Sequence, residues 1–329
     1  GLVRFGELPR FSHEAGTSLR PEHMLDRIEG MLLHAGGLSV FPLALIAAFS
    51  LRRRRWLALP LVAGAAVALG LYQRGAEDLG AASTVVYIVL IAAGSMMLIG
   101  VVSETVIQLA NARGRRPVDT GFVFLASWLL VVMAAIILLL PHVTAKYTLA
   151  FTAPLTLIVV AELERGLSRG PRLTAFIGLT LALTFAGGFA LSVTDYRLAA
   201  SYRDLAASVG ERFSPEGEVW FVGEWGFRHY MEAEGYRYLT SDDTSPAAGD
   251  LVISPAVTDW PLEPTLALRL QPLAVVEVQD AWPLRLMNSG ADAGFYGTHW
   301  GLLPFAVSDE PVESFEVMLV GPRTAGRPD

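Results

Sequence analysis

The sequence predicts a membrane all-α bundle of about six transmembrane helices, followed by a small extracytoplasmic α/β domain. Apolar runs, each near the roughly 20 residues needed to cross a hydrocarbon core of ~30 Å, occupy residues 31–51, 56–73, 82–102, 121–140, 143–163 and 173–193. The composition agrees, because 53% hydrophobic residues and a mean hydropathy of +0.44 exceed the values of an ordinary soluble protein.

Arginines gather in alternate loops between these runs. The arginine-bearing loops contain Arg52, Arg53, Arg54 and Arg55, then Arg113, Arg115 and Arg116, then Arg165, Arg169 and Arg172. The other two loops offer only Arg74 and Lys146. Because basic loops stay in the cytoplasm, we expect a multi-pass inner or plasma membrane protein with both termini extracytoplasmic.

This topology divides the chain into three parts. Residues 1–30 form a polar extracytoplasmic N-terminal segment, 31–193 form the transmembrane bundle and 194–329 form the outer domain. The first residue is Gly, and 1–30 lacks the apolar core of a signal peptide. We therefore expect a processed product or a part of a longer protein.

The outer domain has roughly 135 residues, enough to own a hydrophobic core. An apolar stripe predicts a helix over 195–213, and its members are Leu198, Tyr202, Leu205, Val209 and Phe213. Short apolar runs predict strands at 218–223, 236–240, 250–254, 266–279, 284–288 and 314–320, with a helix at 224–235. Eight acidic residues lie between 216 and 250, which gives this domain no electrostatic reason to bind nucleic acid.

Motifs for metal, cofactor or nucleophilic chemistry are not apparent. The chain contains no cysteine. His229 and Glu232 have a spacing that can share a metal, but two ligands without a third are typical of a solvated helix face. Neither a Gly-rich phosphate loop nor a nucleophile elbow occurs. We therefore predict no metal and no cofactor.

A basic and aromatic group marks the expected outer end of the fifth apolar run. Lys146 and Tyr147 follow Pro141 and His142. A cation, a phenol and an imidazole can hold a lipid phosphate, so Lys146, Tyr147 and His142 are candidate lipid-phosphate ligands. A snorkelling lysine within an aromatic belt explains the same residues.

Other candidates are a histidine and four aromatic residues. His34 precedes Ala35, Gly36 and Gly37, whose small side chains leave room for a pigment macrocycle or another ligand. An interfacial histidine bonded to water or a carbonyl is the alternative. Candidate interface anchors in proline-rich segments are Trp260, Trp282, Trp300 and Phe305, and core packing is the alternative for each.

Several segments resemble a known family in their order along the chain. They are Leu43 to Arg55, Pro141 to Leu155 (PHVTAKYTLAFTAPL), Val219 to Glu232, Gly249 to Pro255 and Gly294 to Pro304 (GFYGTHWGLLP). Together they resemble the later helices and C-terminal domain of GT-C membrane glycosyltransferases, within the protein O-mannosyltransferase and aminoarabinose transferase superfamily. That family has about twice as many helices, and its catalytic aspartate lies in the first outer loop, which this chain does not match.

Three functions follow as hypotheses. The first is a non-catalytic integral subunit that braces or caps a larger membrane assembly, with other integral membrane proteins and membrane lipids as partners. The second is the C-terminal part of a polyprenyl-phosphate-sugar-dependent glycosyltransferase, whose catalytic half lies elsewhere. The third is a pigment- or cofactor-binding subunit that uses His34. Since no general base can be assigned, we expect the chain alone to be inactive.

The topology can be tested by labelling, because the chain has no native cysteine. Each Lys or Arg near an anionic leaflet contributes about 1 kcal/mol to cytoplasmic retention. A membrane-impermeant thiol reagent applied from outside should therefore modify Ser241→Cys and spare Gly114→Cys. The reverse pattern would overturn both the orientation and the outer position of the C-terminal domain.

Overall fold

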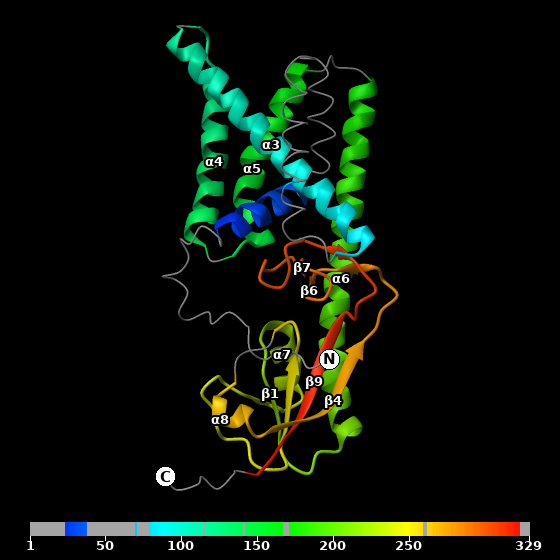
Figure 1. Cartoon of the computed structure of the whole chain (residues 1–329). Coiled ribbons are helices and arrows are strands. Elements are labelled where there is room, and N and C mark those ends of the chain that lie inside the picture. Colours follow the sequence, from blue (N-terminus) through cyan, green and yellow to red (C-terminus); the bar gives the residue numbers. More distant parts are fainter. Residues whose placement is uncertain are drawn as a thin grey trace, which may run out of the picture. The chain divides into compact units, whose positions relative to one another are not determined.

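The computed structural model shows a mostly helical chain with a small α/β region (Figure 1). It describes residues 24–37, 70, 79–114, 116–140, 142–166, 171–258 and 262–322. The chain divides into two compact units. Among the described residues, the helical unit contains those up to Leu191 together with Leu284–Ser308, and the sheet unit contains Ser192–Pro283 and 309–322.

Three helices are long and apolar enough to cross a membrane. They are α3 (Ala81–Arg113), α4 (Thr120–Leu139) and the Ile177–Phe213 part of α6 (Pro171–Phe213). They coincide with three of the six predicted runs. The run at 143–163 corresponds to α5 (Ala145–Gly166), whose apolar part Ala145–Ala161 is shorter. The runs at 31–51 and 56–73 lie mostly outside the described residues, so a count of six spans remains a prediction.

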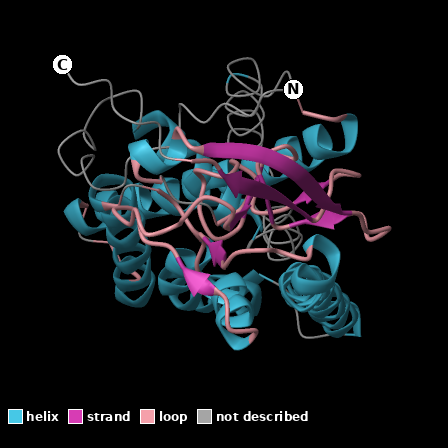
Figure 2. Cartoon of the chain, turned by 90° about the horizontal axis from the view of Figure 1, so that it is seen from below, coloured by secondary structure: helices cyan, strands magenta, loops and turns pink. Residues whose placement is uncertain are grey.

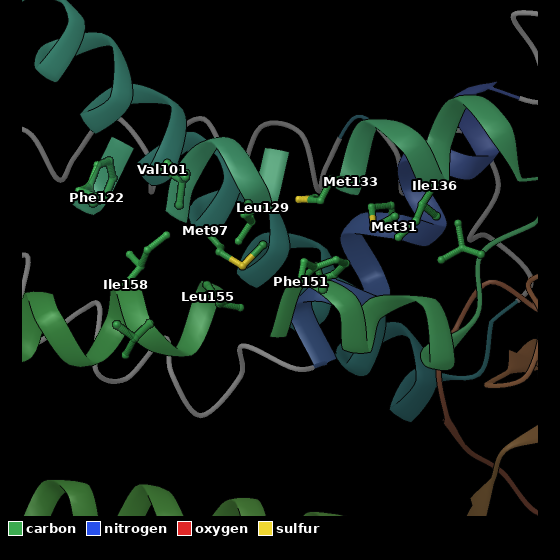
Figure 3. Close-up of a cluster of buried hydrophobic side chains, with 14 residues drawn as sticks. Met31, Met97, Val101, Phe122, Leu129, Met133, Ile136, Phe151, Leu155 and Ile158 are labelled. Atoms are coloured by element: carbon green, nitrogen blue, oxygen red, sulfur yellow. The ribbon is translucent and has the colours of Figure 1, made fainter. Parts of the chain in front are cut away.

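The helices pack through stripes at helical spacing. On α4 the buried residues Phe122, Ala126, Leu129, Met133 and Ile136 recur every three or four positions, which places them on one face. This face meets Met97 and Val101 of α3 and Phe151, Leu155 and Ile158 of α5 in one apolar cluster (Figure 3). The Asp119 side chain begins α4 by accepting a hydrogen bond from the Phe122 N–H at 3.0 Å.

A helix at 24–37 begins inside the segment predicted to precede every helix. Two of its charged residues are buried, with Arg27 at 4% and Glu29 at 9% exposure. The Arg27 guanidinium donates to the Ile137 carbonyl at 2.9 Å, and Glu29 accepts a hydrogen bond from the Tyr87 hydroxyl. These partners are distant in the sequence, so local patterns do not predict them. From the sequence alone, these charged side chains would be expected to face solvent. Their hydrogen bonds offset the free-energy cost of burial.

Two glycines let the helix at 24–37 approach α3 at backbone distance. A Cβ on Gly36 would lie 1.9 Å from the Leu90 carbonyl oxygen, and a Cβ on Gly94 would lie 2.0 Å from the Leu32 carbonyl oxygen. The contact is therefore reciprocal. Small residues at such crossings allow close packing of membrane helices.

The segment Leu284–Ser308 belongs to the helical unit. It folds as two small antiparallel pairs, β5 (Leu284–Arg285) with β8 (Ala306–Val307) and β6 (Met287–Asn288) with β7 (Ala293–Gly294). Its buried residues Ala291, Ala293, Leu303 and Ala306 join a cluster with Leu32, Leu33, Tyr87, Leu90 and Ile91. The attachment combines small side chains with the larger Leu302, Leu303 and Phe305, and these are too scattered in the sequence to form a long apolar run.

The sheet unit contains a five-stranded mixed sheet in the order β2-β1-β3-β9-β4. Its strands are β1 (Val219–Phe221), β2 (Arg237–Tyr238), β3 (Leu251–Pro255), β4 (Leu270–Val278) and β9 (Glu313–Val320). Strands are drawn in magenta in Figure 2. β1 is parallel to β2 and β3, whereas β9 is antiparallel to β3 and β4. The short helices are α7 (Trp225–Ala233) and α8 (Pro264–Ala267).

The predicted elements of this unit are largely present. The stripe on α6 is buried at Leu198, Tyr202, Leu205 and Val209. The run predicted as a strand from 266 begins instead with the end of α8. Pro264 at the start of that helix and the Glu263 side chain, which accepts from the Leu266 N–H at 2.8 Å, explain the difference.

A buried carboxylate joins three parts of the sheet unit. Glu313 Oε1 accepts hydrogen bonds from the N–H groups of Ala256 (3.1 Å), Val257 (3.3 Å) and Ser314 (3.0 Å), and Oε2 accepts from the Tyr202 hydroxyl (2.9 Å). Burial raises the pKa of Glu313 to about 8, although these hydrogen bonds oppose the rise.

The close contact at Gly94 predicts that two Gly→Ala substitutions on α3 change the stability of the helical unit in opposite directions. Gly94→Ala should destabilise the helical unit, because its methyl group meets the Leu32 carbonyl. Gly100→Ala, also on α3, has nothing within 4 Å and should stabilise by up to about 1 kcal/mol through helix propensity. Thermal unfolding of the detergent-solubilised chain measures both, and equal shifts would contradict the close crossing.

The pKa of Glu313 makes a prediction on pH dependence. The folded value, about 8, lies above the reference of 4.5, so the native state holds the proton more tightly. Stability should then fall as pH rises from 4.5 to 8, by at most about 1.4 kcal/mol per pH unit. Glu313→Gln should flatten this slope, whereas Glu216→Gln, at an exposed site, should leave it. Tryptophan fluorescence during thermal unfolding provides the measurement.

Candidate functional site

The candidate site lies in the helical unit, where the residues preceding α5 meet the segment Leu284–Ser308. The Thr298 N–H donates to the Val143 carbonyl at 3.0 Å, and the Val143 N–H donates to Thr298 Oγ1 at 3.2 Å. The Ala145 N–H donates to the Phe295 carbonyl at 2.9 Å. These bonds fix 142–147 against 295–300, although the two stretches are about 150 residues apart in the sequence.

Glycines shape the loop that presents this second stretch. A Cβ on Gly294 would lie 2.1 Å from the Gly301 carbonyl oxygen, and a Cβ on Gly301 would lie 2.1 Å from the carbonyl carbon of Asp292. The two arms of the loop therefore touch through their backbones. This close approach fixes the position of His299 and Trp300 between them.

Imidazole, phenol and ammonium groups gather at the junction. The rings of His142 and His299 lie edge to face with centroids 5.0 Å apart, and the Tyr147 ring lies 6.3 Å from that of His142. Lys146 Nζ lies 5.1 Å from the Tyr147 centroid, within cation–π range. The Trp300 ring packs on His299 with centroids 3.4 Å apart.

The electrostatics of this group rest on Lys146. Burial lowers the pKa of His299 to about 4, with His142 adding to the shift. Burial also lowers the pKa of His142, and Lys146 adds to that shift. Both imidazoles are then neutral near pH 7, each with one N–H to donate, whereas the exposed Lys146 supplies a positive charge.

The start of α5 orients Lys146 and Tyr147. Thr144 precedes the helix, and its Oγ1 accepts from the Tyr147 N–H at 3.4 Å, the position of a capping residue. The Thr144 carbonyl also accepts from the same N–H, at 3.2 Å. The structure thus brings together the three predicted lipid-phosphate candidates, His142, Lys146 and Tyr147.

His34 lies apart from solvent on the helix at 24–37, with 3% exposure. Its Nδ1 is 2.9 Å from the Gly30 carbonyl oxygen, and its ring faces the backbone of Gly294 and Phe295. The space expected beside Gly36 is occupied by the Leu90 carbonyl of α3. Ligand binding by His34 stays a prediction, and the contacts here are those of a packed core histidine.

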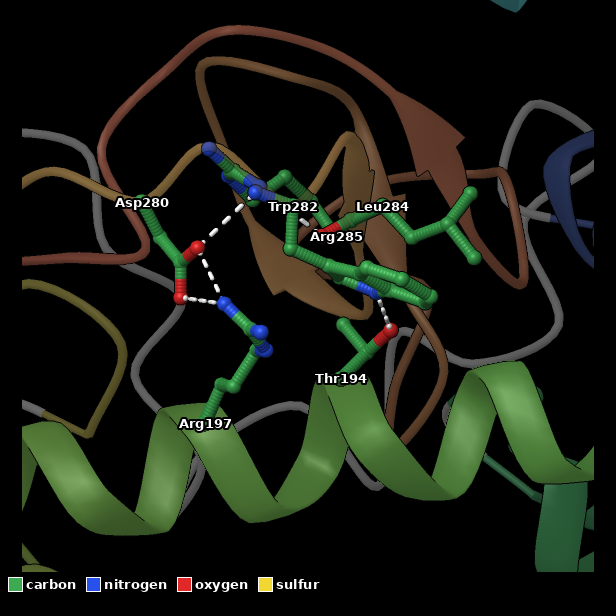
Figure 4. A network of polar contacts seen from close by, with 6 residues as sticks. All are labelled: Thr194, Arg197, Asp280, Trp282, Leu284 and Arg285. Carbon is green, nitrogen blue, oxygen red and sulfur yellow. Dashed lines mark hydrogen bonds and ion pairs between the residues drawn. The ribbon is translucent and has the colours of Figure 1, made fainter.

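The aromatic interface candidates contact their own units. Trp282 donates from Nε1 to Thr194 Oγ1 at 2.8 Å, and the Arg197 guanidinium lies 5.4 Å from its ring centroid (Figure 4). Asp280 forms an ion pair with the same arginine. Trp300 packs on His299 and Phe305 packs against the cluster that includes Leu33. Trp260 lies outside the described residues.

Metal ligands do not converge in the described part of the chain, where no group of three His, Cys, Asp or Glu side chains could hold an ion. On α7, Glu232 forms an ion pair with Arg228. His299 was not predicted as a lipid-phosphate ligand, although it lies in the segment from Gly294 to Pro304 that resembles the glycosyltransferase family. Its flanking glycines at 294, 297 and 301 were the one available signal of a tight loop.

No family model, curated protein or solved structure matches this chain.

Proposed function

We propose that this chain is a membrane-integral module of a GT-C-type glycosyltransferase that binds the phosphate group of a polyprenyl-phosphate lipid. The observation that supports this proposal is the junction of His142, Lys146 and Tyr147 with His299 and Trp300. The resemblance to that superfamily, noted for the segments around residues 141–155 and 294–304, points in the same direction.

The group has the donors that a phosphate requires. Lys146 supplies a positive charge. Tyr147 and the two neutral imidazoles can each donate a hydrogen bond to a phosphate oxygen, and the negative charge of the acceptor makes such bonds stronger. The rings of Trp300 and Tyr147 offer apolar faces to the first isoprene units. Binding of the dianion would favour the protonated imidazoles, so affinity for the lipid should rise as pH falls.

The position of the group suits a lipid headgroup. His142 lies between α4 and α5, and Lys146 and Tyr147 lie in the first turn of α5. α4 is long and apolar enough to cross a membrane, and α5 contains a shorter apolar part. Basic and aromatic side chains at such helix ends lie at the depth of lipid headgroups. In the proposed topology this end is extracytoplasmic, the face from which these transferases use their lipid-linked donors.

A specific feature of α6 favours a second function, that of a subunit bracing a larger membrane assembly. Only 11% of its apolar window is buried within the chain, compared with 44% for α3. Phe185 and Phe189 are 76% and 62% exposed, and their stacked rings have centroids 6.5 Å apart. Gly188 has nothing within 4 Å of its Cβ position. Another membrane helix could pack closely on this face.

The lipid site makes a prediction on binding. The chain in nanodiscs should bind a polyprenyl monophosphate more tightly than the polyprenol that lacks phosphate. Lys146→Ala should weaken this binding about tenfold or more, because a hydrogen bond to a charged group is lost. Lys146→Arg should retain most of the affinity. His299→Gln should reduce the increase in lipid affinity that is expected at low pH. Arg116→Ala is the control, since this cation stands in another loop.

Two outcomes would contradict the lipid-phosphate proposal. One is equal binding of polyprenol and polyprenyl phosphate, and the other is equal competition by a bulk anionic phospholipid. Native mass measurement of the same preparation separates the second function. A co-purifying membrane protein that is lost in Gly188→Leu would support a bracing role, whereas a monomer with bound lipid would favour the transferase module.

A further inference from the structure

A groove in the sheet unit separates α6 from the edge strand β4. It has a volume of about 410 Å³, and its α6 wall includes Arg197, Asp204 and Arg212. The opposite wall is an unbroken run, Val276 to Asp280. The ion pair between Arg197 and Asp280 links the two walls.

The open edge of β4 borders this groove. Among the strands that the structure describes, β4 is the last of the sheet and pairs only with β9. Successive side chains of a strand point to opposite faces, so a groove lined by consecutive residues lies along the strand's edge. The Val278 carbonyl accepts from the Val312 N–H on the β9 side. The backbone groups of Val275 and Glu277 therefore point to the open edge.

The chemistry of the edge strand indicates what would bind there. Val275 is 60% exposed, and the exposed Glu277 follows it on the same face. Leu273, at the irregularity between Pro272 and Ala274, is 53% exposed. β4 contains no basic residue, and the charged residues that line the groove are three acids, Asp204, Glu277 and Asp280, and two arginines, Arg197 and Arg212. A strand added here would meet apolar side chains and a negative charge.

We propose that this groove is the docking site for a basic, extended segment of a partner polypeptide, which adds a strand to β4 and places a Lys or Arg beside Glu277. Main-chain hydrogen bonds to the edge would give affinity, and the side-chain pairs would give specificity. A second copy of this chain fits less well, because pairing β4 with itself brings two acidic units together. The proposal is independent of the lipid site.

Peptide probes test the strand addition directly. The full chain in detergent should bind a labelled peptide of about ten residues that alternates lysine and valine, measured by fluorescence anisotropy. The matched peptide alternating glutamate and valine should bind at least about tenfold more weakly. The lysine peptide with N-methyl groups on alternate amides keeps its charge but loses its ladder donors, and should also bind about tenfold more weakly.

Variants of the chain locate the site. Glu277→Lys should weaken binding of the lysine peptide and strengthen that of the glutamate peptide, whereas Glu234→Gln, an exposed acid on another element, should change neither. Val275→Pro removes an outward N–H from a strand that already accommodates Pro272, and should weaken binding of both peptides.

Several results would overturn the proposal. If the N-methylated peptide bound as tightly as the unmethylated lysine peptide, the interaction would depend on charge alone and not on strand pairing. If Glu277→Lys left peptide binding unchanged, the peptide would bind elsewhere than at β4. If the lysine peptide did not bind at millimolar concentration, the proposed docking site would be excluded. Dimers of the chain that cross-link through Gln279→Cys, displaced by no peptide, would assign the edge to a second copy instead.

Discussion

The backbone contact between the helix at 24–37 and α3 is the constraint on which the helical unit depends. With Gly36 against the Leu90 carbonyl and Gly94 against the Leu32 carbonyl, the two helices meet without intervening side chains. This approach places Leu32 and Leu33 beside Tyr87 and forms the surface on which the segment Leu284–Ser308 packs. The position of that segment in turn brings His299 to His142. A larger residue at either glycine would therefore also disturb the arrangement of His142 and His299 at the candidate site.

The candidate site and the buried charges use the same physical device. Two buried charged residues of the helical unit are hydrogen-bonded to distant groups, since Arg27 donates to the Ile137 carbonyl and Glu29 accepts from the Tyr87 hydroxyl. At the junction the partners are backbone groups, with Thr298 bonded to Val143. Hydrogen bonding of this kind fixes one register of the loop. The neutral imidazoles and the exposed Lys146 then form a site whose charge comes from one residue.

The sheet unit follows a different logic. Its core is an apolar stripe of α6 on a sheet, and Glu313 ties β9 to α6 and to the residues that follow β3. Among the described strands the sheet ends on β4, whose outward backbone groups lie beside α6. An open edge is a hazard unless it is covered or charged. Glu277 and the ion pair of Arg197 with Asp280 moderate this edge, which is consistent with selective pairing.

The sequence by itself determined those features that depend on local periodicity. Long apolar runs predicted α3, α4 and the first part of α6, and the stripe from Leu198 to Val209 predicted the continuation of α6, because spacing and hydrophobicity repeat within a few residues. Only the tertiary structure decided that Glu29 is buried, that the segment Leu284–Ser308 joins the helical unit and that His299 meets His142. These features depend on contacts between residues far apart in sequence. Glycine contacts, hydrogen bonds and isolated side chains make those contacts, and none of these leaves a periodic pattern.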